Sequence, residues 1–276
     1  MLWVPPVRLR TAESNLAATP ALTRTGATVT GSATIHTKGP FTQLIAATAA
    51  ATQLVYIMLS DTTVSAARSD TLVDIAIGPA GSERVILPNL LAGWAPPLRL
   101  SPRTLILPLY IPSGMRISAR AQSITASKQV GVAIWCYGGP NNPIMPTFTE
   151  AEAIGVSTAS SIGTSVLPGT GAGVEGAWTN IGPVTTRAFD AIIPMIQGGL
   201  ANTVMTQAAE HWEVGVGGTV LGEFVGYSDA FEHVAGLWPP LPIFVPVSVG
   251  TQLQIRGETS AAAAQAHDLA ILGLVG

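Results

Sequence analysis

The chain contains an internal repeat, and this feature restricts its fold more than any other. Segment 41–44 (FTQL) resembles segment 178–181 (WTNI), at an offset of 137 residues from Phe41 to Trp178. Four further blocks follow in the same order at nearly the same offset: VYIM 55–58 with IIPM 192–195, VDIAIG 73–78 with WEVGVG 212–217, IPSGMRI 111–117 with VSVGTQL 247–253, and AI 133–134 with AI 270–271. Five blocks in register predict two copies of one structural unit.

The local pattern within each copy is that of β-strands. Segments 54–58, 84–87, 105–111 and 130–135 are short apolar runs rich in β-branched and aromatic residues. Segment 115–120 alternates between apolar and polar residues, as a half-exposed strand does. The 29 glycines and 21 prolines are spread along the chain as breaks between such runs. We therefore predict an all-β chain of two tandem antiparallel β-sandwich domains, with a jelly-roll-like arrangement favoured.

The positions of the repeat blocks predict the domain boundaries. Residues 31–138 form the first sandwich and residues 177–276 the second. Residues 139–176 are rich in Gly, Pro, Ser and Thr, which predicts a linker. Residues 1–30 precede the first repeat and are predicted to form an extended N-terminal arm, which can order by packing on a partner.

Composition limits the classes of partner. Hydrophobic residues make up 47% of the chain and charged residues only 11%, so we expect a homo-oligomer that covers part of this weakly charged surface. Residues 1–138 contain 11 Lys or Arg and 5 Asp or Glu, a net charge of +6; residues 139–276 contain 2 and 11, a net charge of −9. The basic half is too mildly charged to predict nucleic-acid binding. No segment is predicted to insert into a membrane or to act as a signal peptide.

Catalytic and cofactor motifs are not found. The glycine-rich segment 215–222 lacks the lysine of a phosphate-binding loop and is better explained as a hairpin. The single cysteine, Cys136, lies in an apolar run and is predicted to be a buried, inert thiol. We therefore predict a protein that is not an enzyme and has no cofactor or metal.

One segment of the second copy is richer in polar and aromatic side chains than the rest. It begins with the sequence EHWE at 210–213 and contains five residues that we consider as a carbohydrate-binding set: Trp212, Asp229, Glu232, His233 and Trp238. Carboxylates accept hydrogen bonds from sugar hydroxyls, and an exposed indole ring covers the apolar face of a sugar. A metal site and a carboxylate pair for glycoside cleavage are alternatives. A plain polar loop edge beside an inward-pointing tryptophan is the structural alternative.

Two arginines occupy the same framework position in the two copies. Arg120 and Arg256 each follow the alternating strand after a glycine turn, at Gly114 and Gly250. A shared position favours a structural role over ligand binding. We expect each guanidinium to hold a loop carbonyl or a neighbouring subunit.

With the repeat defined, two segments of the first copy carry a resemblance to a known class of proteins. Segments 73–86 (VDIAIGPAGSERVI) and 107–120 (LPLYIPSGMRISAR) resemble a module of virion surface proteins, head spikes and fibres, of tailed phages and phage-derived gene transfer agents. The second copy matches more loosely, since Ser248 replaces Pro112. The resemblance implies a jelly-roll-like module in a symmetric oligomer, three-fold as the default for a fibre or five-fold for a capsid vertex.

The resemblance also implies a function. We expect a structural virion protein, assembled in the bacterial cytoplasm, that attaches to other virion proteins through its N-terminal arm and first domain. Its second domain would contact the host surface, with polysaccharide as the expected ligand. A decoration or cement protein without a ligand is the alternative, followed by a capsule-degrading glycosidase.

Overall fold

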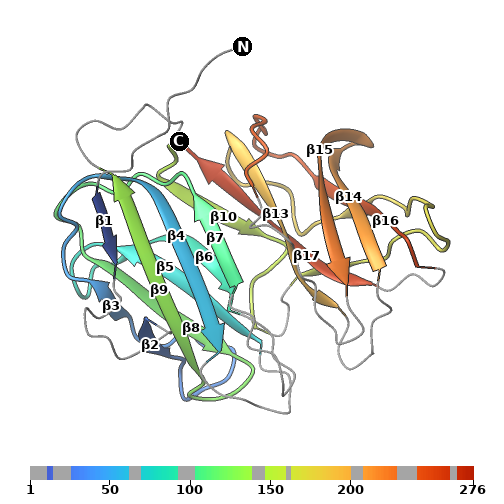
Figure 1. Cartoon of the computed structure of the whole chain (residues 1–276). Coiled ribbons are helices and arrows are strands. Elements are labelled where there is room, and N and C mark those ends of the chain that lie inside the picture. The colour runs from blue at the N-terminus through green and yellow to red at the C-terminus, as the bar shows by residue number, and fades with distance from the viewer. Residues whose placement is uncertain are drawn as a thin grey trace.

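The computed structural model describes residues 11–14, 26–61, 70–92, 103–138, 147–159, 163–199, 208–228, 241–261 and 266–276, and the statements below concern these residues. They form strands and no helix, and they build two sandwiches that lie side by side (Figure 1). This confirms the predicted all-β class and the antiparallel sandwich architecture. None of these residues belongs to a helix with the length and apolar character needed to cross a membrane.

The first sandwich contains nine of these strands. They are β1 (Thr11–Ser14), β2 (Ala27–Thr30), β3 (Thr42–Ile45), β4 (Thr52–Asp61), β5 (Thr71–Ile77), β6 (Arg84–Leu91), β7 (Arg103–Leu107), β8 (Ile117–Ser123) and β9 (Gln129–Gly138). One sheet has the order β1-β9-β4-β7, with β2 also on β9, and the other has the order β3-β8-β5-β6. The pairs β2·β9, β3·β8, β4·β7 and β5·β6 are antiparallel and nested, which is the connectivity of a jelly roll.

The described residues of the second sandwich repeat three of these four pairs as ladders, and an isolated antiparallel bridge between Ile192 and Ile243 stands in place of β4·β7. Its strands are β10 (Glu150–Ile154), β11 (Thr164–Val166), β12 (Thr179–Asn180), β13 (Ala191–Gly199), β14 (Ala208–Val216), β15 (Thr219–Ser228), β16 (Leu253–Thr259) and β17 (His267–Val275). Strands β10, β11 and β13 pair with β17, and the other sheet has the order β12-β16-β14-β15. We call these sheets the β17 sheet and the β14 sheet, and their counterparts in the first jelly roll the β9 sheet and the β5 sheet.

The boundaries predicted from sequence need correction at both copies. Strands β1 and β2 lie within residues 1–30 and both pair with β9, so these parts of the expected arm belong to the first jelly roll. Strands β10 and β11 lie within the expected linker and pair with β17. Both segments are rich in small and hydroxylated residues, which resemble a linker in composition. Their structure comes from backbone pairing with the last strand of each copy, which is distant in sequence.

The repeated glycine turn has a buried anchor. Thr48 donates a hydrogen bond from Oγ1 to the carbonyl of Pro112 (2.7 Å) and accepts one from the amide of Met115 (3.1 Å). Thr185 does the same with Ser248 (2.8 Å) and Thr251 (3.0 Å). The glycine in each turn, Gly114 or Gly250, has φ +78°, which favours glycine. The motif that carries the family resemblance therefore has a structural role in both copies.

One apolar core continues from the first jelly roll into the second. It joins the interior of the first sandwich to the outer face of the β17 sheet, where Ile193 and Leu272 are fully buried. An ion pair between Arg84 and Glu150 (2.8 Å) lies at the edge of this interface. A separate core, which includes Trp212 and Ile255, fills the second sandwich.

Candidate functional site

Strand β14 carries the polar and aromatic segment of the second copy, and its alternation divides that segment between two faces. Glu210 and Trp212 point into the sandwich and are buried, whereas His211 and Glu213 lie on the outer face of the β14 sheet. Side chains that are adjacent in sequence therefore form two separate clusters, one internal and one external.

The internal cluster joins a carboxylate, an imidazole and an indole. His267, on β17, is fully buried, and its Nε2 lies 2.7 Å from Oε1 of Glu210, although the geometry is not that of a regular hydrogen bond. The imidazole contacts Trp212 edge to face, with ring centroids 5.4 Å apart. Trp212 Nε1 and His267 Nδ1 have no hydrogen-bond partner among the described residues. Burying polar atoms without hydrogen-bond partners is unfavourable. This cluster is therefore a polar and energetically costly part of an otherwise apolar core.

The first copy has apolar or neutral residues at the same places. Thr71 corresponds to Glu210, because Thr71 pairs with Ser123 at the place in the ladder where Glu210 pairs with Thr259. Val130 corresponds to His267 at the repeat offset of 137 residues. Thr71 donates a hydrogen bond to Ser123 (3.0 Å). The Glu–His pair is thus a property of the second copy alone.

The external cluster is centred on Arg256. Its Nε donates to Glu213 (2.5 Å), and its Nη1 forms an ion pair with Glu175 (2.6 Å). The guanidinium lies over the ring of Trp178, 4.7 Å from the centroid. The hydrogen bond to Glu213 raises the pKa of Arg256 above its usual value, so the group stays charged.

Trp178 fits on the sheet because of a glycine. A Cβ at Gly215 would lie 2.6 Å from both Cη2 of Trp178 and the carbonyl oxygen of Thr219, so a larger residue would require one of them to move. In the first copy the smaller ring of Phe41 occupies this place, 4.7 Å from the guanidinium of Arg120, and the strand carries Ala76 where the second copy has Gly215. The larger ring and the smaller strand residue therefore occur together.

Further acidic side chains continue the external cluster along the sheet. His211 lies between two carboxylates, with Nε2 3.3 Å from Glu223 and Nδ1 3.6 Å from Glu258. Val225, also on this face, is 74% exposed. We call the set Glu175, Trp178, His211, Glu213, Glu223, Arg256 and Glu258 the acidic face. Within the described part of the chain, no group of three or more His, Cys, Asp or Glu side chains is arranged to hold a metal ion.

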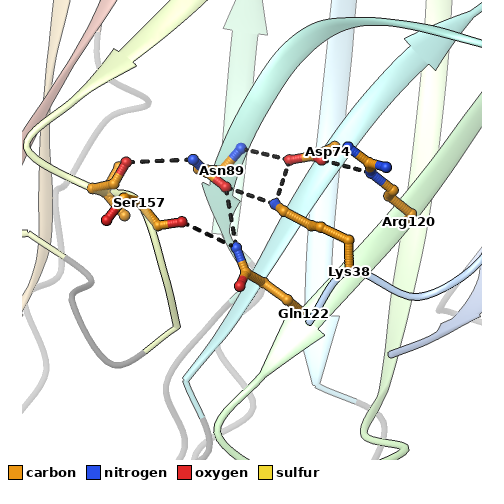
Figure 2. Close-up of polar contacts among 7 residues, drawn as sticks. Lys38, Asp74, Asn89, Arg120, Gln122 and Ser157 are labelled. Atoms are coloured by element: carbon orange, nitrogen blue, oxygen red, sulfur yellow. Dashed lines mark hydrogen bonds and ion pairs between the residues drawn. The ribbon is translucent and has the colours of Figure 1, made fainter. Parts of the chain in front are cut away.

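The equivalent cluster of the first copy has a different environment (Figure 2). Asp74 accepts from Nε of Arg120 (2.8 Å) and from Nζ of Lys38 (2.6 Å). Its side chain is 3% exposed. Burial lowers the pKa of Lys38 below its usual value, and the neighbouring Asp74 opposes this shift. Two cations thus surround one carboxylate here, whereas two carboxylates surround one cation in the second copy.

The first-copy cluster is tied to the second domain. Asn89 donates from Nδ2 to the carbonyl of Val156 (3.3 Å), and Gln122 donates from Nε2 to that of Ser157 (3.3 Å) (Figure 2). Asn89 also accepts from Lys38 (2.6 Å) and has a positive φ of 54°. This network is internal to the molecule, and we assign it a structural role.

The structure gives mixed results for the residues selected from sequence. Trp212 is fully buried, so the expectation that it presents an open ring to a sugar is wrong, because its strand position points inward. Asp229, Glu232, His233 and Trp238 lie outside the described residues. Arg120 and Arg256 do occupy equivalent positions, but they bind carboxylates of their own domain and not a loop carbonyl.

None of the carbohydrate-binding residues selected from the sequence belongs to the acidic face, and four members of this face had no predicted role: Glu175, Trp178, Glu223 and Glu258. The repeat offset contained a usable signal for two of them, since Glu175 aligns with Lys38 and Trp178 with Phe41. Glu223 and Glu258 reach the same surface only through the pairing of β14 with β15 and β16, which the sequence pattern does not specify.

Comparisons with known proteins support no functional assignment. No protein-family model matches the chain, and no curated protein matches it. Among solved structures, PNGF-II has a TM-score of 0.38 and 10% identity, and the match covers 90% of this chain but 65% of that one. PNGase F, a glycosylasparaginase from Flavobacterium meningosepticum, has a TM-score of 0.32 and 9% identity over 90% of this chain and 96% of that one.

A tandem carbohydrate-binding-module pair is also similar at a low level. The CBM22-1–CBM22-2 domains of Paenibacillus barcinonensis Xyn10C have a TM-score of 0.27 and 10% identity, with 88% of this chain and 85% of that one covered. These similarities are too weak to carry an argument about activity or ligand. The chain is, from its own topology, a tandem jelly-roll protein.

Proposed function

We propose that the chain is a non-enzymatic surface protein of a phage-like particle, part of a spike or fibre, and that its second jelly roll binds polysaccharide of the host envelope. The first jelly roll and the residues before it attach to the particle. The proposal combines the resemblance of the first copy to virion surface modules with the difference in chemistry between the two copies.

The observation that carries the binding assignment is the acidic face. The equivalent surface of the first copy is bound to the second domain through Asn89 and Gln122, whereas the acidic face includes exposed groups such as Glu223, which is 60% exposed. Carboxylates accept hydrogen bonds from neutral sugar hydroxyls, and a guanidinium donates to them. The half-buried indole of Trp178 adds an apolar ring edge beside these groups.

Binding of the full-length protein to purified host polysaccharide tests this assignment. The double variant Glu223→Gln and Glu258→Gln removes one exposed and one half-buried charge of the acidic face without touching the core. We expect it to weaken binding at least tenfold, since hydrogen bonds to charged groups are about 1.5–3 kcal/mol each. Glu152→Gln, on β10 of the same domain, is the matched control and retains binding.

Two other results would replace this assignment. Equal binding by the double variant and the wild type would exclude the acidic face. Release of new reducing ends from the polysaccharide would favour the glycosidase alternative, whereas incorporation into particles without any polysaccharide binding would favour a cement protein.

Attachment to the particle requires its own test. Removal of residues 1–30 would delete strands β1 and β2 and disturb the first jelly roll, so the informative deletion is residues 2–10, which precede β1. We expect this variant to fold and to be absent from purified particles. Normal incorporation would contradict attachment through this segment.

A further inference from the structure

The outer face of the β9 sheet in the first jelly roll is apolar. Strands β4, β7 and β9 bury one set of alternate residues, such as Val55 and Ile134, in the core. The other set faces outward. Its six larger apolar members are half-buried: Leu54, Tyr56, Met58, Ile106, Trp135 and Tyr137. The set also contains the buried Ala133 and the uncharged polar residues Ser60 and Thr104, and none of these described side chains is charged. We call the six larger apolar residues the open face. The rings of Tyr56 and Trp135 contact each other edge to face, with centroids 5.0 Å apart.

The same face of the second jelly roll is covered. At the repeat offset of 137 residues, Tyr56 corresponds to Ile193, Met58 to Met195 and Trp135 to Leu272. Ile193 and Leu272 are fully buried and Met195 is 3% exposed, and all three belong to the apolar core that includes the first jelly roll. The second jelly roll therefore uses the outer face of its last-strand sheet to bind the first jelly roll.

The internal contact cannot simply be repeated between two molecules. In the chain, the face of the β17 sheet is packed against the first jelly roll, where Leu72 and Leu91 are almost fully buried. At the ladder pair that matches Leu72 and Leu91, the second jelly roll has His211 and Val225. The neighbouring side chains on that face are the carboxylates of the acidic face. Packing this surface on the open face would bury charges against apolar side chains, which is strongly unfavourable.

We propose that the open face of the first jelly roll packs against the open face of a second copy of this chain, related by a two-fold axis. An uncharged face with a central Tyr–Trp pair is complementary to itself, and a two-fold contact buries the same patch on both partners. Tyr and Trp are the residues that most often dominate binding at such contacts. The pairing goes beyond the proposed function, and it leaves the acidic faces of both copies free.

Measurement of the mass of the full-length protein in solution tests the pairing. Light scattering or sedimentation is expected to give twice the 28.4 kDa of one chain at micromolar concentration. Met58→Glu and Ile106→Glu each place a charge in the centre of the contact and are expected to weaken dimerisation at least tenfold. Circular dichroism and thermal unfolding of each variant verify that the fold is retained.

Val225→Glu is the matched control, since it also replaces an apolar residue on an outer sheet face, and it is expected to remain a dimer. A monomeric wild type at about 50 µM, or a trimer or pentamer, would overturn the two-fold pairing. Folded Met58→Glu and Ile106→Glu variants that stay dimeric would also overturn it. Polysaccharide binding is measured separately, so failure of one proposal does not imply failure of the other.

Discussion

Lys38 and Glu175 occupy equivalent positions in the two jelly rolls and carry opposite charges. Nζ of Lys38 lies 2.6 Å from Oδ1 of Asp74, and Oε2 of Glu175 lies 2.6 Å from Nη1 of Arg256. In each jelly roll an arginine and a carboxylate on equivalent strands form an ion pair, and Lys38 or Glu175 is the third charge of that cluster. The same framework position therefore carries a cation where the β5 sheet packs on the second domain, and an anion where the β14 sheet presents the acidic face.

The two charges should differ in their effect on stability. Lys38→Met removes a cation from Asp74, whose side chain is 3% exposed, and is expected to lower the free energy of unfolding by about 2 kcal/mol, because loss of one partner leaves a buried carboxylate less compensated. Glu175→Gln removes a charge that is 48% exposed and should change it by less than about 1 kcal/mol. Urea unfolding of both variants measures the difference. Equal losses would show that the two clusters are equally solvated.

Asn89 should couple the two domains through both its side chain and its backbone. Asn89→Gly keeps the positive φ but removes the side-chain hydrogen bonds to Val156 and Lys38, and we expect a loss of about 2 kcal/mol. Asn89→Ala adds the strain of a left-handed backbone and should lose about 1 kcal/mol more. Hydrogen exchange at residues 156–157 should rise in both variants. Unchanged exchange in this segment would contradict the coupling.

The glycine turns should respond equally in the two copies. Gly114 and Gly250 share φ +78°, and a Cβ at either position would meet no heavy atom within 4 Å. Alanine at each site should therefore lower stability by about 1 kcal/mol through backbone strain alone. Urea unfolding measures this loss, with Ser113→Ala as the control beside Gly114. A much larger loss at one site would show that the two turns are not equivalent.

Prediction from sequence was most successful where the two copies agree. The repeat offset and the short apolar runs predicted the tandem sandwiches, because the strands repeat in order with their turns. The same comparison failed at β1, β2, β10 and β11, where composition resembled an arm or a linker and only pairing with a distant strand defines the structure. The acidic face was missed for a related reason: its side chains come from neighbouring strands that are distant in sequence, whereas the residues selected from the sequence lie close together in it.

The same limit applies to Trp212. Its neighbours Glu210, His211 and Glu213 suggested a single polar site, but strand alternation separates them onto two faces. The sequence shows that side chains on this strand alternate between two faces. It does not show which face points into the core, because polar residues occupy both faces.

The buried Glu210–His267 pair should behave as a unit. His267→Val removes the imidazole that lies 2.7 Å from Glu210, and Glu210→Thr removes the carboxylate beside His267. Each single change is expected to lower the free energy of unfolding by about 3 kcal/mol, because it leaves a polar partner in a buried site. The double variant restores the residues of the first copy, Thr71 and Val130, and should lose clearly less than the two single variants together. Urea unfolding of all four proteins completes the cycle. Strict additivity would show that the two side chains do not interact, and that the second copy holds them for separate reasons.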